Sequence, residues 1–148
     1  MHRGFLGIVL LGFVSCTSPN AIEEVQFPNA CWTLTDTLSW KPQAESELNP
    51  ALFVEFTDDY AYRNLFVKVW VEKPDGVLQD TLWQAMVVDS MGYWIPPVGR
   101  NERVRYIFPQ SLWHGGEKPN RITVVQYMRD SVLCGVERVG IVLGEGLP

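Results

Sequence analysis

The chain has 148 residues and a formal net charge of −5, from 12 basic and 17 acidic side chains. This negative balance argues against a nucleic-acid partner and against electrostatic binding to anionic lipid, because both need clustered Lys and Arg.

The N-terminal segment is predicted to be a lipoprotein signal peptide of residues 1–15. Arg3 supplies a positive charge, and the uncharged run 5–14 is too short to cross a hydrocarbon core of about 30 Å. Residues 13–16 read Phe-Val-Ser-Cys, which resembles a bacterial lipobox with Phe13 in place of the usual Leu. Cys16 is therefore the predicted lipidated first residue of the mature protein. The alternative is an ordinary secretory peptide in which Cys16 is incidental.

Residues 16–22 are expected to form a lipidated tether, and residues 23–148 a single domain. Residues 17–20, which directly follow Cys16, include no acidic residue, and most of them are polar. This pattern favours the periplasmic side of a cell-envelope membrane over display on the cell exterior. The acyl chains would then hold the protein to the bilayer.

The rest of the chain predicts an all-β fold, a single antiparallel β-sandwich of about seven or eight strands, since turn-forming residues recur at the spacing typical of short strands. Residues 65–72 form the clearest strand, because Leu and Val alternate with Phe, Lys, Trp and Glu. A turn at 74–76 and a return along 78–86 would complete a hairpin. Further strands are predicted at residues 22–27, 37–40, 52–57, 104–108, 121–128 and 136–143.

No residue pattern predicts catalysis, a metal site or a cofactor. His114, the only histidine after the signal peptide, lies in a Gly-rich turn without a nucleophile motif beside it. Asp58 and Asp59 are adjacent, and neighbours on a strand point to opposite faces, so a solvated loop is favoured over a calcium site. We therefore expect a non-enzymatic protein without a small-molecule substrate. A small hydrolase using His114 is the weakest alternative.

Cys31 and Cys134 admit two interpretations. A disulfide between them would close a loop of roughly 100 residues, worth up to about 4.7 kcal/mol in the chain-entropy model. Unpaired cysteines are equally common as small core residues. The chain has no Cys-x-x-Cys or Cys/His spacing that would indicate a metal or redox site.

Tryptophan is abundant for a small domain, at positions 32, 40, 70, 83, 94 and 113. Aromatic faces stack on sugars, which makes a carbohydrate-binding envelope lipoprotein the alternative function. Tryptophan is also enriched in cores and protein interfaces, and this is the favoured interpretation. Candidate partner-surface residues are Trp70, Trp94 and Arg129. Arg129 could instead pair with a nearby carboxylate or a strand-end carbonyl.

Several short stretches, taken in order, resemble one family. They are residues 26–32, 36–38, 62–67, 74–76, 80–82, 92–94, 108–109, 126–130, 133–136 and 139–141. Together with the lipobox they resemble the gliding motility lipoprotein GldH family of the Bacteroidetes, over roughly residues 23–143. After Trp94 the family pattern is richer in glycine than residues 95–99 are here.

The resemblance implies a cell-envelope lipoprotein associated with the gliding machinery and with the secretion apparatus linked to it. It implies no catalytic residues. The expected partners are therefore the membrane, through the lipid anchor, and other envelope or gliding-machinery proteins.

Overall fold

A computed structural model describes residues 21–42, 50–95, 103–112 and 118–143. The predicted signal peptide, Cys16, His114, Trp113 and most of the loop after Trp94 lie outside these residues. Within the described part, no helix is long and apolar enough to cross a membrane.

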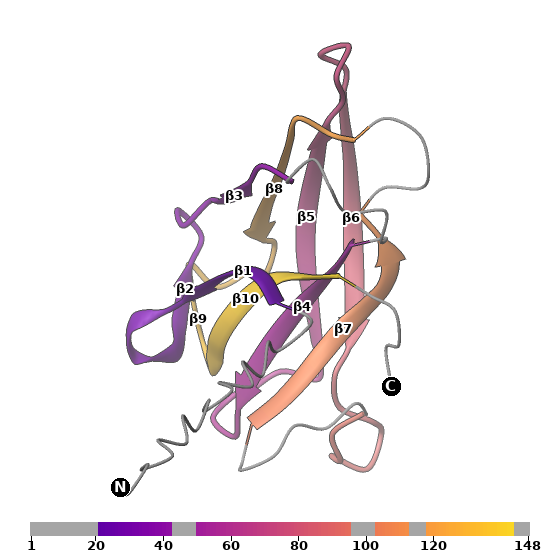
Figure 1. Ribbon diagram of the computed structural model, residues 1–148. Coiled ribbons are helices and arrows are strands. Elements are labelled where there is room, and N and C mark those ends of the chain that lie inside the picture. Colours follow the sequence, from indigo (N-terminus) through magenta and orange to yellow (C-terminus); the bar gives the residue numbers. More distant parts are fainter. Residues whose placement is uncertain (1–20, 43–49, 96–102, 113–117, 144–148) are drawn as a thin grey trace, which may run out of the picture.

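The described residues form an all-β sandwich, as predicted (Figure 1). One antiparallel sheet has the order β1-β10-β4-β7, a second has the order β3-β8-β5-β6, and β2 pairs with β9 in a short third sheet. The elements are β1 Ala21–Gln26, the 3-10 turn η1 Pro28–Ala30, β2 Cys31–Thr33, β3 Leu38–Trp40, β4 Pro50–Thr57, β5 Asn64–Glu72, β6 Leu78–Met86, β7 Arg103–Ser111, β8 Arg121–Gln126, β9 Val132–Cys134 and β10 Val136–Leu143.

The sequence predicted eight of these strands and missed two. β2 and β9 have three residues each, too few for a period-2 pattern to stand out, and they pair only with each other. The strand predicted at 121–128 ends at Gln126, because the next residues turn away to form a loop. The strand predicted at 22–27 is β1, which begins at Ala21 and ends at Gln26.

The β5–β6 hairpin matches the predicted hairpin closely. Leu65, Val67 and Val69 point into the sandwich and are buried, while the intervening residues face outward. Gly76 takes the left-handed conformation (φ 81°) in the turn, and the Lys73 amide donates to the Val77 carbonyl at 2.9 Å.

The core lies between the two four-stranded sheets. Inward residues from both sheets belong to one buried cluster, which includes Phe56 and Phe108 from the first sheet and Val67 and Ile122 from the second. Removal of this apolar surface from water is the main favourable contribution to folding.

The outer face of the first sheet carries a row of alternating charges across its four strands. Arg138 on β10 lies 3.0 Å from the Glu24 carboxylate on β1 and 2.7 Å from the Glu55 carboxylate on β4. Arg105 on β7 lies 3.6 Å from the other Glu55 oxygen. Glu55 is buried, so its neutralisation by two guanidinium groups offsets the cost of removing it from water.

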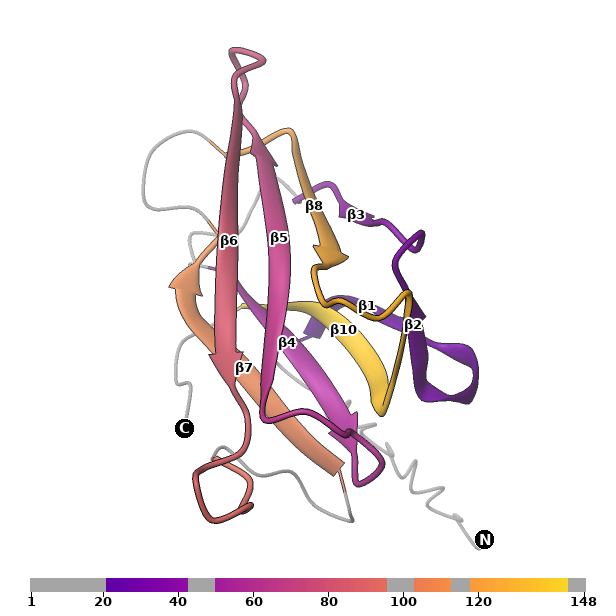
Figure 2. The ribbon, with the colours of Figure 1, turned by 180° about the vertical axis from the view of Figure 1, so that it is seen from behind.

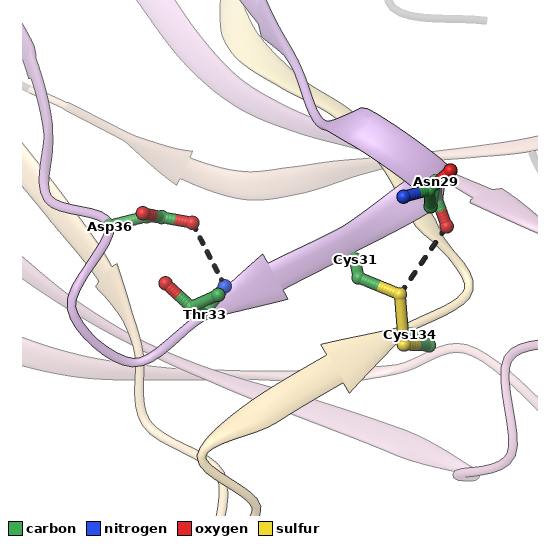
Figure 3. Close-up of a disulfide and its surroundings, with 5 residues drawn as sticks. All are labelled: Asn29, Cys31, Thr33, Asp36 and Cys134. Atoms are coloured by element: carbon green, nitrogen blue, oxygen red, sulfur yellow. Dashed lines mark hydrogen bonds between the residues drawn. A yellow bond between two sulfur atoms is a disulfide. The ribbon is translucent and has the colours of Figure 1, made fainter.

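A disulfide joins Cys31 on β2 to Cys134 on β9, two residues that face each other in register (Figure 3). It links positions 103 apart in the chain. The Cys31 sulfur also lies 3.3 Å from the Asn29 carbonyl oxygen, which is a close contact because a disulfide sulfur has no proton to donate. At the other end of β2, the Thr33 amide donates to the Asp36 carboxylate at 3.0 Å.

Gly135 forms a tight corner between β9 and β10. Its φ is +85°, and its carbonyl accepts a hydrogen bond from the Thr57 amide at 2.9 Å. A Cβ at this position would lie 2.4 Å from backbone atoms of Tyr60. Glycine is therefore required here both for its conformation and for the close approach of another backbone segment.

We predict that Gly135→Ala destabilises the fold much more than Gly76→Ala. Both glycines have positive φ, but a Cβ at Gly76 would meet nothing within 4 Å. Gly76→Ala should therefore cost only the conformational strain, about 1–2 kcal/mol. Gly135→Ala should cost at least about twice that, because a backbone clash adds to the strain. Denaturant unfolding measures both, and equal losses would contradict the proposed clash.

Candidate interaction groove

An open groove of about 460 Å³ lies on the outer face of the β3-β8-β5-β6 sheet. The start of β5, the middle of β6 and the loop that follows β8 come together there. The lining residues are Tyr62, Asn64, Phe66, Leu82, Tyr127, Met128 and Arg129.

The β5 side of the groove follows from strand alternation. Leu65 and Val67 are fully buried in the core, so Asn64 and Phe66 must point to the opposite face. Before the strand, Tyr60 is buried and its hydroxyl donates to the Asn64 carbonyl at 2.7 Å. This bond fixes where β5 begins and hence where its outward side chains lie.

Gln126 organises the loop that forms the other side. Its side chain is fully buried. The amide nitrogen donates to the Asp130 carbonyl at 2.8 Å, and the amide oxygen accepts a hydrogen bond from the Met128 amide at 2.7 Å. One side chain therefore satisfies a donor and an acceptor of the turn, which holds Tyr127 and Arg129 on the surface.

Three further contacts fasten the loop to β5 and to the segment just before it. The Tyr127 amide donates to the Phe66 carbonyl at 2.8 Å, and the Phe66 amide lies 3.3 Å from the Met128 sulfur. The Tyr62 hydroxyl donates to the Asp130 carboxylate. This last bond raises the pKa of the Tyr62 phenol, because the hydrogen bond to the carboxylate stabilises the protonated form.

Arg129 is the charged residue of the lining. It is exposed, and within the described part of the chain its guanidinium has no hydrogen-bond or ion-pair partner. The neighbouring Asp130 carboxylate accepts from Tyr62 instead. The described residues therefore contain no structural ion pair of Arg129.

Trp70 and Trp94, the other candidate partner-surface residues, do not line the groove. Trp70 lies half-buried on the same sheet face, with the Lys68 ammonium 5.2 Å from its ring centroid. Trp94 is half-buried too, but its ring packs against Phe56 of the core at 5.8 Å. Among the three candidates, only Arg129 belongs to the groove.

The described tryptophans do not form a sugar-stacking platform. Trp32, Trp40 and Trp83 are buried, and Trp70 and Trp94 are half-buried. A platform of this kind needs two or three exposed, coplanar rings. The tryptophans in the described ranges instead fill the core and its margins.

The groove has the chemistry of a binding surface. Its polar groups are two phenols, one amide and one guanidinium. No group of three or more His, Cys, Asp or Glu that could hold a metal ion occurs in the described ranges. Asp58 and Asp59 are exposed in a turn after β4. Aromatic rings beside an unpaired guanidinium suit recognition of an apolar side chain together with a carboxylate.

Sequence reasoning found Arg129 but missed Gln126 and the convergence of the lining residues. A signal for that convergence was present, because all seven lining residues fall within three of the stretches that carry the family resemblance: 62–67, 80–82 and 126–130. These stretches include exposed residues that the core does not require, such as Leu82 and Tyr127.

We predict that Gln126→Met loosens the loop. The near-isosteric change leaves the Met128 amide and the Asp130 carbonyl without their partner, at a cost of about 1–3 kcal/mol. Denaturant unfolding should show this loss, and hydrogen exchange at the Met128 amide should accelerate. Gln79→Met, at an exposed glutamine of β6, serves as the control. A Gln126→Met protein as stable as the control would contradict the organising role of Gln126.

A protein-family model described as GldH lipoprotein matches residues 21–143, which include every strand and all of the groove. Comparisons with the curated proteins and with the solved structures found no match. The family match covers most of the chain and agrees with the resemblance drawn from the short stretches. The chain therefore belongs to the GldH lipoprotein family.

Proposed function

We propose that the protein is a non-enzymatic component of the cell-envelope machinery for gliding motility and its linked secretion, which acts by binding a partner protein in the groove. The observation that carries this proposal is the convergence of three family-resembling stretches on one exposed, apolar surface, with an arginine that has no partner among the described residues. The lining supplies contacts for a partner, and no nucleophile–base set is part of it.

The proposed anchor is a lipid on Cys16, on the periplasmic side of a membrane. Only five chain steps separate Cys16 from Ala21, where β1 begins. At about 3.5 Å per residue these steps span roughly 17 Å at most. The β-sandwich would therefore be held close to the membrane surface, within reach of other anchored or integral envelope proteins.

The proposed partner is a protein segment that offers an apolar side chain next to a carboxylate. The apolar group would pack on Phe66, Met128 and Leu82, and the carboxylate would pair with the Arg129 guanidinium. This choice follows from charge complementarity, since Arg129, in a chain of net charge −5, has no ion-pair partner among the described residues. Tyrosine and arginine are the residue types that most often dominate binding energy at such interfaces.

We predict that Cys16→Ser releases the protein from the membrane. Without the thiol no acyl group can be attached, and removal of the acyl chains removes the main source of membrane affinity. Cell fractionation and metabolic labelling with palmitate measure the effect, with Thr17→Ser as a neighbouring control that keeps the cysteine. A Cys16→Ser protein that stays in the membrane fraction would contradict lipidation at this residue.

We predict that Arg129→Glu lowers recovery of envelope partners by at least about tenfold, which corresponds to about 1.4 kcal/mol. The change places a carboxylate where the partner's carboxylate should bind. The measurement is a pull-down of the lipidated, full-length protein from envelope extracts, followed by quantification of co-purified gliding and secretion proteins.

Lys41→Glu is the matched control, because it makes the same change in charge at an exposed position of the described surface. If Arg129→Glu and Lys41→Glu recovered the envelope partners equally, the groove would not be the partner-binding surface. If the unmodified protein recovered no gliding or secretion protein, the result would contradict its proposed place in that machinery.

A further inference from the structure

β6 lies at an edge of its sheet and has a free side. It pairs with β5 over all nine of its residues, without a register shift, and no strand lies beyond it among the described residues. Figure 2 shows β6 beside β5, where it is the last strand of its sheet, and the β5–β6 hairpin reaching past the rest of the described body. A strand with an unpaired edge is a template for a further strand.

Two backbone bonds at the ends of the hairpin establish which groups face outward. The Lys73 amide donates to the Val77 carbonyl, and the Val87 amide donates to the Arg63 carbonyl, both at 2.9 Å. In an antiparallel ladder, bonded pairs alternate with pairs whose groups point away. Odd-numbered residues of β6 therefore bond to β5. The free edge belongs to the even-numbered residues Leu78, Asp80, Leu82, Gln84 and Met86.

Among the described residues, this edge lacks the features that usually prevent strand addition. Residues 78–86 contain no proline, glycine or lysine, and the ladder has no bulge. The single charge, Asp80, is already paired with Lys68 at 3.1 Å. Three large apolar side chains on the edge residues are exposed: Leu78 at 60%, Leu82 at 51% and Met86 at 43%.

The edge is complementary to a copy of itself. In an antiparallel pair centred on Leu82, Leu82 faces its own copy, Leu78 faces Met86, and Asp80 faces Gln84. Each apolar side chain then meets an apolar one, and the acid meets an amide. Even-numbered residues face even-numbered residues in this register, so the outward amides and carbonyls of both copies match as bonded pairs.

Neighbouring registers are worse. A centre at Asp80 places two carboxylates opposite each other, which is unfavourable. A centre at Thr81 or Trp83 sets Leu82 against Asp80 or Gln84. A centre at Gln84 leaves Leu78 and Asp80 outside the paired strand. Only the centre at Leu82 pairs all nine residues.

We propose that β6 pairs with β6 of a second copy of this chain, antiparallel and centred on Leu82, so that two four-stranded sheets become one continuous sheet. The two-fold axis of such a pair is perpendicular to the sheet. Both copies therefore turn the outer face, with its groove, to the same side. β1 lies in the other layer in both copies.

This geometry suits a membrane-anchored chain. Because β1 follows the tether in the sequence, both anchors start from the same layer of the dimer and can enter one membrane. Confinement of the copies to one membrane raises their effective concentration, which favours an interface made by a single strand from each copy. The proposal does not depend on which envelope partner binds the groove.

The test is disulfide trapping in the full-length, lipidated protein. Facing residues of a bonded antiparallel pair have Cα atoms about 5.5 Å apart, within the range that a disulfide bridges. Leu82→Cys should therefore give, on mild oxidation of envelopes, a reducible band at twice the mass of the chain. Leu34→Cys is the matched control, since Leu34 is a leucine of similar exposure (48%) away from β6.

A second variant measures the interface without a cross-link. Leu82→Lys places two like charges opposite each other, so the dimer fraction in detergent, measured by sedimentation, should fall at least about tenfold relative to Leu34→Lys. Absence of the band, an equal band from Leu34→Cys, or an unchanged dimer fraction would overturn the proposal.

Discussion

The pairing of β2 with β9 is the constraint on which the rest of the described structure depends. The Cys31–Cys134 disulfide joins two short strands that pair only with each other among the described residues. The middle residues of these strands, Trp32 and Leu133, are fully buried. Gly135 then turns the chain directly into β10, the strand that lies between β1 and β4. A loop of about 100 residues closed in this way removes up to about 4.7 kcal/mol of chain entropy from the unfolded state in the entropic model.

The β2–β9 pairing also restrains the loop that lines the groove. The loop that presents Tyr127 and Arg129 runs from β8 to β9, so its first end is held by Gln126 and its second by the strand that the disulfide pins. The Leu34 amide adds a bond to the Ser131 carbonyl at 2.7 Å. A short loop held at both ends loses little conformational freedom when a partner binds, which is how a small surface can give useful affinity.

The sequence predicted what depends on local pattern and missed what depends on distant partners. The hairpin at β5–β6 and the strand β10 were predicted at or within one residue of their bounds, because apolar alternation and turn residues are local signals. β2 and β9 are strands only because they pair with each other. The sequence left open whether Cys31 and Cys134 form a disulfide or are unpaired core residues. Gln126 fell inside the strand predicted at 121–128, and its role requires a fold that brings its amide onto a turn.

Site-specific photo-cross-linking tests most directly the proposed contact between the groove and another envelope protein. A photoreactive phenylalanine analogue would replace Tyr127 in the lipidated protein, in intact envelopes. Tyr93, an exposed tyrosine that does not line the groove, provides the comparison (65% against 55% for Tyr127). A discrete cross-link to an envelope protein is expected from position 127 and none from position 93. Equal labelling at both positions, or no cross-link from position 127, would contradict it.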